Sequence, residues 1–293
     1  MSKWLVIGAS SFTGKHFCEY LRKRGEKVDE ASLRQGYLRS APYVVNFAAA
    51  NVVAPSWIWS EEYMKVNVNR QLHFWNALRV WEDLVHYVHV STPEVYGSTT
   101  GFITEDAPYN PSTPYAVSRA AAEMMLKCYH KQYGLPVIFT RACNVYGPGQ
   151  QLYRLIPKLI VSIKKGIRFP LEGGGSSYRA FLHVEDVCAA TYLAATKGQT
   201  GQAYHISSTN LQSIVNIARM ICEMMKVDFE EAVEIVSERP GKDSAYELRS
   251  QKIRELGWRD EIKLPEGIRS VIDWVEGNWD TLKDQPMEYE FKP

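Results

Sequence analysis

The chain has 293 residues, of which 45% are hydrophobic and 23% charged, and its formal net charge is +1 at pH 7. A chain so close to neutral has little bulk electrostatic attraction for nucleic acid or a membrane surface, so we expect neither as a partner. No apolar run approaches the ~20 residues that a membrane helix needs. The five cysteines form no C-x-x-C pair, which argues against a zinc or other metal site and against a disulfide scaffold. We therefore expect a soluble, cytoplasmic protein.

Short apolar runs alternate with amphipathic segments along the first half of the chain. Strands are expected over 4–7, 27–33, 43–48, 85–90 and 137–141, and helices over 15–23, 61–81 and 113–133. This alternation is typical of a parallel sheet with helices on both faces. A looser region follows, with expected helical segments near 156–165, 250–256 and 266–274. The four tryptophans near the second helix are interpreted as helix packing or a subunit interface: Trp57, Trp59, Trp75 and Trp81.

A turn from Gly8 to Gly14 follows the first expected strand and leads into a helix. Glycine lets the backbone approach a pyrophosphate, and the start of the next helix supplies oriented N–H groups and a positive dipole. Strand, turn and helix together predict a dinucleotide site. The residue that reads the adenosine ribose is expected at the end of the second strand, where Ser32 stands, with Arg34 two residues on. A basic side chain there favours the 2′-phosphate of NADP, whereas an acidic one favours NAD.

Three other segments contain reactive side chains. Residues 91–97 read Ser-Thr-Pro-Glu-Val-Tyr-Gly and residues 141–149 read Arg-Ala-Cys-Asn-Val-Tyr-Gly-Pro-Gly, each directly after an expected strand. Tyr115 and Arg119 are four residues apart on an expected helix, so they share a face. The carboxyl ends of neighbouring parallel strands face one crevice, so we expect the three segments to converge beside the cofactor. A tyrosine of pKa about 10 needs a nearby cation before it can act as a base at neutral pH.

Together these segments resemble the extended short-chain dehydrogenase/reductase family, and most closely its nucleotide-sugar 4,6-dehydratases of the dTDP-glucose type. The resemblance covers nearly the whole chain and includes residues 176–187, 238–246 and 252–258. It implies an α/β fold with a Rossmann-like, doubly wound parallel sheet over 1–150. A smaller substrate-binding α/β region would cover 151–293, with roughly 180–205 returning to pack on the first domain. It also implies a bound NAD or NADP, with NAD favoured, a nucleotide-sugar substrate, and a homodimer joined through helices 61–81 and 113–133.

The resemblance assigns a role to each candidate site residue. Tyr115 would take the proton of a sugar hydroxyl while hydride leaves C4 for the nicotinamide, with Arg119 in place of the family's lysine. Thr92 would hydrogen-bond the C4 oxygen, and Glu94 would remove the C5 proton before water leaves from C6. Cofactor contacts are implied for Gly8, Ser10, Ser11, Phe12, Thr13, Gly14, Ser32, Arg34, Ala48, Ala49, Asn67, Tyr115 and Arg119. Contacts with the nucleotide and its diphosphate are implied for Asn144, Arg154, Leu155, Arg179 and Arg239.

The chain departs from the family pattern close to the reacting atoms. Pro93 replaces the aspartate that protonates the leaving C6 hydroxyl, so the acid would be Glu94, a water or another side chain. The middle glycine of the cofactor turn is Ser11. Three alternatives therefore stay open: a nucleotide-sugar 4-epimerase, a UDP-glucuronate-type decarboxylase, and a catalytically weak NAD(P)-binding sensor or scaffold. Glu94 argues against the epimerase, which needs no base at C5, and the retained Thr92, Glu94 and Tyr115 argue against a pure binder.

Overall fold

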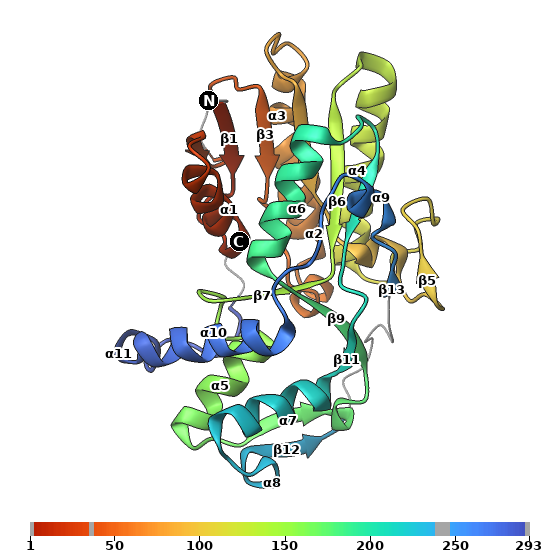
Figure 1. Ribbon diagram of the computed structural model, residues 1–293. Helices are drawn as coiled ribbons and strands as arrows, with labels where there is room; N and C mark the ends of the chain where they lie inside the picture. Colours follow the sequence, from red (N-terminus) through yellow and green to blue (C-terminus); the bar gives the residue numbers. More distant parts are fainter. Residues whose placement is uncertain (1–2, 35–37, 238–246, 291–293) are drawn as a thin grey trace.

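A six-stranded parallel sheet forms the centre of the larger part of the molecule. The computed structural model describes residues 3–34, 38–237 and 247–290 (Figure 1). The strand order is β10-β6-β4-β3-β1-β2, and every neighbouring pair is parallel. The strands are β1 (Lys3–Ile7), β2 (Lys27–Ala31), β3 (Tyr43–Asn46), β4 (His86–Val90), β6 (Val137–Ala142) and β10 (Ala203–Ile206). The predicted parallel sheet is confirmed.

Helices cover both faces of this sheet because its inner strands are buried on both sides. Successive side chains of a strand point to opposite faces. Trp4 and Val6 of β1 belong to the cluster that packs against α1 (Phe12–Lys23) and α6 (Val184–Lys197). Leu5 and Ile7 belong to the cluster that packs against α3 (Arg70–Leu78) and α4 (Pro114–Tyr133). Figure 1 shows α1 and α6 together on the near side of the sheet. The result is the doubly wound α/β fold that the sequence predicts.

The helix predicted over 61–81 is not continuous. It consists of α2 (Ser60–Met64), a π-helical turn η2 (Lys65–Asn69) and α3, which ends at Leu78. The buried Asn67 lies in the π turn, where it accepts the N–H of Ala50 (2.8 Å) and donates to the Ala50 carbonyl (3.1 Å) and to Ser118 Oγ (2.9 Å). These tertiary hydrogen bonds lie at the π turn, where the regular i to i−4 hydrogen bonds of the α-helix are interrupted. Such turns are common at functional positions.

A second, smaller core lies beyond the sheet. Its helices are α5 (Leu155–Lys165), α7 (Ile214–Met225) and α10 (Leu264–Gly277), which pack with the parallel pair β8 (Phe169–Glu172) and β12 (Val233–Val236). A three-stranded sheet, β11 (Leu211–Ser213), β9 (Tyr178–His183) and β7 (Asn144–Tyr146), lies between the two cores (Figure 1). The remaining elements are η1 (Ala54–Trp57), η3 (Pro93–Tyr96), β5 (Phe102–Ile103), η4 (Gly173–Gly175), α8 (Phe229–Ala232), β13 (Glu247–Leu248), α9 (Gln251–Glu255) and α11 (Trp279–Leu282).

The strand order reverses between β1 and β3, because β2 lies on one side of β1 and β3 on the other. Ligands of open α/β sheets bind at such a reversal, outside the carboxyl ends of the strands. The turn after β1 is tied to both neighbours: the Gly8 N–H donates to the Ala31 carbonyl (3.1 Å), and the Phe47 N–H donates to the Ile7 carbonyl (2.8 Å). Three strand ends thus meet at one crevice. Within the described ranges, no helix has the length and apolar character required to cross a bilayer.

Candidate active site

The turn between β1 and α1 requires glycine at two positions. Gly8 has a φ of +74°, and a Cβ there would lie 2.7 Å from the Ala48 nitrogen. A Cβ on Gly14 would overlap the Gly8 carbonyl, because α1 begins directly against the strand end. The Ser11 hydroxyl donates to that carbonyl (2.7 Å) and accepts the Gly14 N–H (3.2 Å), so it caps α1 and draws the helix start forward to Phe12.

Phe12 and Thr13 are the first two residues of α1. Their N–H groups come before that of Gly14, which is the first to be paired, with the capping Ser11 hydroxyl. Such groups at a helix start bind anions, since they add to the positive end of the helix dipole. The exposed Ser10 lies beside them. The turn can therefore accept a diphosphate even though Ser11 stands in place of a glycine.

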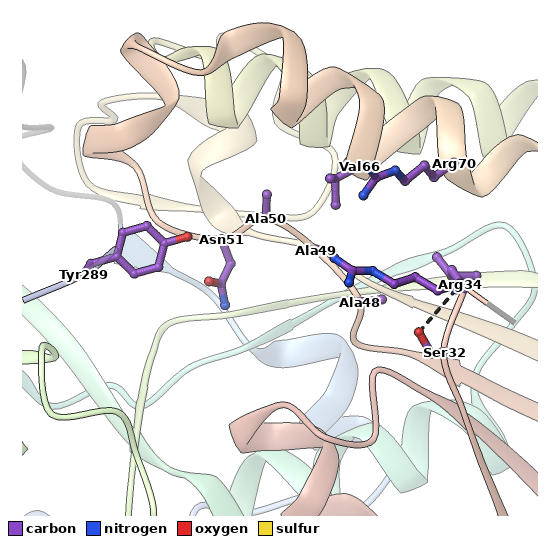
Figure 2. A pocket seen from close by; sticks show the side chains of 10 residues that line it. Ser32, Arg34, Ala48, Ala49, Ala50, Asn51, Val66, Arg70 and Tyr289 are labelled. Carbon is purple, nitrogen blue, oxygen red and sulfur yellow. Dashed lines mark hydrogen bonds between the residues drawn. The ribbon is translucent and has the colours of Figure 1, made fainter. Parts of the chain in front are cut away.

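A pocket lies beside this turn, at the ends of β2 and β3 (Figure 2). We call it the β2–β3 pocket, lined by Ser32, Leu33, Arg34, Ala48, Ala49, Ala50, Asn51, Val66, Arg70 and Tyr289. The structure thus places four of the predicted cofactor residues together: Ser32, Arg34, Ala48 and Ala49. Asn67 reaches the pocket indirectly, since its amide is hydrogen-bonded to the backbone of Ala50.

Thr92, Glu94 and Tyr115 lie together past the end of β4. The Thr113 hydroxyl caps α4 by accepting the Ala116 N–H (3.1 Å), which places the buried Tyr115 in the first turn. The Thr92 hydroxyl caps η3 through the Glu94 N–H (3.3 Å) and is hydrogen-bonded to Tyr115. Burial raises the pKa of Tyr115 above its usual value, and the nearby Glu94 carboxylate adds to the rise. The Arg119 guanidinium and the Thr92 hydrogen bond oppose it.

Arg119 lies one helical turn after Tyr115 and is 2% exposed. Its Nη2 donates to the Val90 carbonyl and lies 3.4 Å from His89 Nε2. Burial and the Arg119 charge lower the pKa of His89 to about 3, so that ring is neutral. Arg119 Nε and Nη1 find no hydrogen-bond acceptor among the described residues. Unsatisfied buried donors are costly, and the ribose hydroxyls of a dinucleotide are acceptors of the kind they lack.

The residues proposed to contact the nucleotide lie farther along the chain and are less closely grouped. Arg154, which precedes α5 and its first residue Leu155, donates to the Asn51 carbonyl (3.4 Å) and is close enough to Tyr115 to lower its pKa. Asn144 donates to the Ala180 carbonyl (3.1 Å) between β7 and β9. The other two predicted members are Arg179, which lies on β9 and donates to the Tyr178 carbonyl, and Arg239, which lies outside the described residues.

Two tyrosines that the sequence analysis did not predict belong to the site. The Tyr63 ring packs edge-on against Tyr115, with centroids 6.2 Å apart, and its hydroxyl donates to the Val52 carbonyl. Tyr289 is hydrogen-bonded to Tyr63 and packs edge-on against Tyr153, with centroids 5.1 Å apart. Tyr289 lies in irregular chain beyond the last helix, where no sequence pattern points to a site. The described residues contain no group of three or more His, Cys, Asp or Glu side chains arranged to hold a metal ion.

Comparison with known proteins shows the family of the chain. Residues 29–271 match the family described as GDP-mannose 4,6 dehydratase. The chain is 35% identical over 243 residues to a trifunctional UDP-glucose 4,6-dehydratase/UDP-4-keto-6-deoxy-D-glucose 3,5-epimerase/UDP-4-keto-L-rhamnose-reductase of Arabidopsis thaliana, over 80% of this chain and 36% of the relative. It therefore spans about a third of the length of that plant relative. It is 34% identical over 247 residues to the dTDP-D-glucose 4,6-dehydratase of Homo sapiens, over 82% of this chain and 70% of the relative.

Solved structures show the same fold. The dTDP-glucose 4,6-dehydratase of Streptomyces venezuelae, determined with NAD bound, superposes with a TM-score of 0.88 at 28% identity. That alignment covers 95% of this chain and 98% of the other. The match over residues 29–271, the sequence relatives and this shared fold show that the chain belongs to the GDP-mannose 4,6 dehydratase family, within the extended short-chain dehydrogenases/reductases.

Proposed function

We propose that the protein is a nucleotide-sugar 4,6-dehydratase, which converts a nucleotide-activated hexose into its 4-keto-6-deoxy derivative. The observation that carries the proposal is the cluster of Thr92, Glu94 and Tyr115 beside the predicted cofactor crevice. A protein that only binds a dinucleotide has no use for a carboxylate next to a buried tyrosine. The relatives named as 4,6-dehydratases support the same reaction.

The residues at the crevice fit a nicotinamide dinucleotide. The Gly8 turn and the free N–H groups that begin α1 suit its diphosphate, and the two unpartnered Arg119 nitrogens suit its ribose hydroxyls. When bound, such a cofactor accepts a hydride from C4 of the sugar and returns it to C6. Arg119, held by the Val90 carbonyl and by neutral His89, would fix the cofactor and keep a positive charge near Tyr115.

Tyr115 would act as the base for the sugar C4 hydroxyl. Its burial disfavours the phenolate, while Arg119 and the hydrogen bond from Thr92 favour it. The balance of these effects sets the pH at which the base becomes available. Thr92, already hydrogen-bonded to Tyr115, is placed to hold the C4 oxygen as the proton leaves.

Glu94 would carry out the elimination. A C4 carbonyl makes the neighbouring C5 proton acidic, so a carboxylate can remove it. Pro93, the buried residue before Glu94, has no proton to donate. We therefore propose that Glu94 passes the C5 proton to the departing C6 hydroxyl, which leaves as water and regenerates the carboxylate. When hydride is returned to C6, C5 takes up one proton from solvent, and Tyr115 releases the proton that it took from the C4 hydroxyl, so the protons balance over the cycle.

The test is mass spectrometry of products after incubation with dTDP-, UDP-, CDP- and GDP-hexoses and UDP-glucuronate, each with NAD and with NADP. A product lighter by one water is the expected result and also identifies the nucleotide. Pro93 is the one observation that favours a second candidate, a nucleotide-sugar 4-epimerase, because epimerisation needs no acid at C6. An unchanged mass with altered sugar stereochemistry would establish that candidate, and loss of carbon dioxide would establish a decarboxylase. Conversion of no substrate would contradict the dehydratase.

We further propose a homodimer formed through α2, α3 and α4. Apolar side chains are exposed on and beside these helices, among them Trp57 (60% exposed) and Met124 (56%). Ile58, Trp59 and Val117 add to this surface, whereas Trp75 is fully buried within the chain. Apolar patches of this kind commonly mark subunit contacts. Analytical ultracentrifugation tests the proposal, since a dimer has twice the 33.4 kDa mass of the chain.

A further inference from the structure

We propose that the β2–β3 pocket binds the 2′-phosphate of NADP between Arg34 and Arg70, so that this chain prefers NADP to NAD. The inference rests on the proposed function and deepens it by naming the cofactor. It differs from what the solved relatives suggest, since the Streptomyces venezuelae enzyme was determined with NAD. The observations that carry it are the residue at the end of β2, the two arginines, and the composition of the pocket.

The end of β2 lacks the carboxylate that would hold a free 2′-hydroxyl. Ala31 lies opposite Ile7 in the sheet, so Ser32 is the first residue past the strand, level with the Gly8 turn. An acidic residue at this place hydrogen-bonds the ribose of NAD and repels a phosphate. Ser32 has no charge, and its hydroxyl can donate to a phosphate oxygen.

The two carboxylates of β2, Asp29 and Glu30, cannot take the place of the missing acidic residue, because each is paired with a basic side chain outside the pocket. Asp29 Oδ2 lies 3.2 Å from Lys3 Nζ, and Glu30 forms an ion pair with Arg22 on α1. Neither lines the pocket, and none of the ten lining residues is acidic. Among the described residues, the charged side chains that line the β2–β3 pocket are therefore Arg34 and Arg70, both of them cationic.

The backbone of Arg34 is fixed by the turn in which it lies. Its backbone N–H donates to Ser32 Oγ at 3.2 Å, which closes the chain just after β2. Figure 2 shows its side chain extending across the pocket towards Ala49. Arg34 forms no ion pair with any residue that the structure describes, so its guanidinium is available to an anion.

Arg70 enters the same pocket from α3. Its Nη2 lies 3.9 Å from Glu62 Oε2, at the outer limit of an ion pair, while Lys65 Nζ is only 2.9 Å from the other oxygen of Glu62. Lys65 is therefore the closer of the two cations to the Glu62 carboxylate. Two guanidinium groups from separate elements suit a phosphate, because each can make paired, charge-assisted hydrogen bonds to its oxygens.

The test is isothermal titration calorimetry of the full chain after removal of copurified dinucleotide, whose identity is recorded by mass spectrometry. The titrants are NADP, NAD, and the fragments adenosine 2′,5′-bisphosphate and 5′-AMP, which differ only in the 2′-phosphate. We expect the 2′-phosphorylated member of each pair to bind about tenfold tighter or better. The preference should fall as salt is added, because exposed charges are screened.

Variants separate the two arginines from general surface charge. Arg34→Gln and Arg70→Gln should each weaken NADP binding about tenfold while changing NAD binding less than about threefold. Arg39→Gln is the matched control, because Arg39 is exposed in the same connection but does not line the pocket, and it should change neither affinity. Ser32→Asp should shift the preference towards NAD. Circular dichroism of each variant verifies folding.

Tighter binding of NAD than NADP would overturn the inference but leave the proposed dehydratase intact, since NAD could serve the same chemistry. Equal losses of NAD and NADP affinity in Arg34→Gln and Arg70→Gln would also overturn it, because the arginines would then not read the 2′-phosphate. If neither dinucleotide bound, both the inference and the proposed function would fail.

Discussion

Opposing effects act on the pKa of Tyr115, and their balance should be seen in the pH dependence of the reaction. Burial raises the pKa of Tyr115, and the Arg119 guanidinium lowers it. In the proposed mechanism the base is the Tyr115 phenolate, so activity should rise with pH through this pKa. Arg119→Met removes the opposing charge, so the rising limb of kcat should move to higher pH. Measurement at saturating cofactor separates this shift from weaker cofactor binding. Arg119→Lys keeps the charge and should stay near the parent profile, and an unmoved limb in Arg119→Met would show that Arg119 does not tune the base.

Substitutions at Glu94 and at Tyr115 should block different steps of the proposed reaction. Glu94→Gln should still reduce the bound cofactor with substrate, seen as absorbance at 340 nm in a single turnover, but lose about 10²–10⁴-fold in water elimination. Tyr115→Phe should block the reduction itself, because the C4 hydroxyl then has no base. Full turnover by Glu94→Gln would mean that another group removes the C5 proton. Pro93→Asp restores an acid and should accelerate elimination if proton delivery by Glu94 limits the rate.

That Thr92, Glu94 and Tyr115 lie together could be predicted from the sequence, because each lies in a short segment at a strand end or in the first turn of a helix. The same reasoning could not find Arg70 or Tyr289. Both reach the β2–β3 pocket from elements distant in the chain, and no local pattern distinguishes them from other surface side chains. Sequence reasoning also could not show the role of Ser11, which stands where the family has a glycine in the turn after β1. In the structure its hydroxyl caps α1.

At the scale of whole elements, α4 is attached to β6 by a fully buried ion pair. Arg141 Nη2 lies 2.5 Å from Glu123 Oε2, and neither side chain is exposed. The pair is surrounded by hydroxyls: Arg141 donates to Tyr96 and Tyr109, and Tyr109 donates to Glu123 (2.7 Å). Burial alone would raise the pKa of Glu123, but the charge and hydrogen bonds of Arg141 outweigh it and bring the value to about 2. The pair thus fixes the helix that carries Tyr115.

Removal of one partner should destabilise the fold strongly. Glu123→Gln leaves the Arg141 charge buried without a counter-charge, so urea denaturation should show a loss of about 3–5 kcal/mol in the free energy of unfolding. The double variant Glu123→Gln with Arg141→Met removes both charges and should recover part of that loss. The parent's contribution from this carboxylate is complete above its unfolded pKa of 4.5 and is lost as the pH falls towards about 2, because its folded pKa is depressed. A Glu123→Gln loss below 1 kcal/mol would contradict this account.

Strand and helix positions were largely predictable because they depend on local periodicity and caps, such as Thr113 before α4 and Gly134 after it. The π turn between α2 and α3 was not, because it coincides with hydrogen bonds from Asn67 to Ala50 and Ser118, which lie 17 and 51 residues away in the chain. A regular apolar pattern over residues 61–81 does not contain that information. Differences of this kind fall at the site, where tertiary contacts override local preference.

At the scale of the whole molecule, the end of the described chain returns to the β2–β3 pocket. From α11 in the second core, the chain runs back so that Tyr289 lines the β2–β3 pocket and packs against Tyr153 beside Arg154. Glu288 is anchored to Lys158 of α5 by an ion pair of 2.7 Å. The segment therefore joins the second core to the β2–β3 pocket and covers one side of that pocket.

Tyr289→Ala should consequently weaken dinucleotide binding without abolishing it. Loss of the ring opens one wall of the pocket to water, so the dissociation rate of bound cofactor should rise several-fold, while the association rate, set by the unchanged arginines, stays similar. Stopped-flow displacement of reduced dinucleotide fluorescence measures both rates. Tyr133→Ala is the matched control, because Tyr133 is half-exposed at the end of α4 and lies outside the pocket. A dissociation rate in Tyr289→Ala equal to that of Tyr133→Ala would show that the returning segment covers the pocket without retaining its ligand.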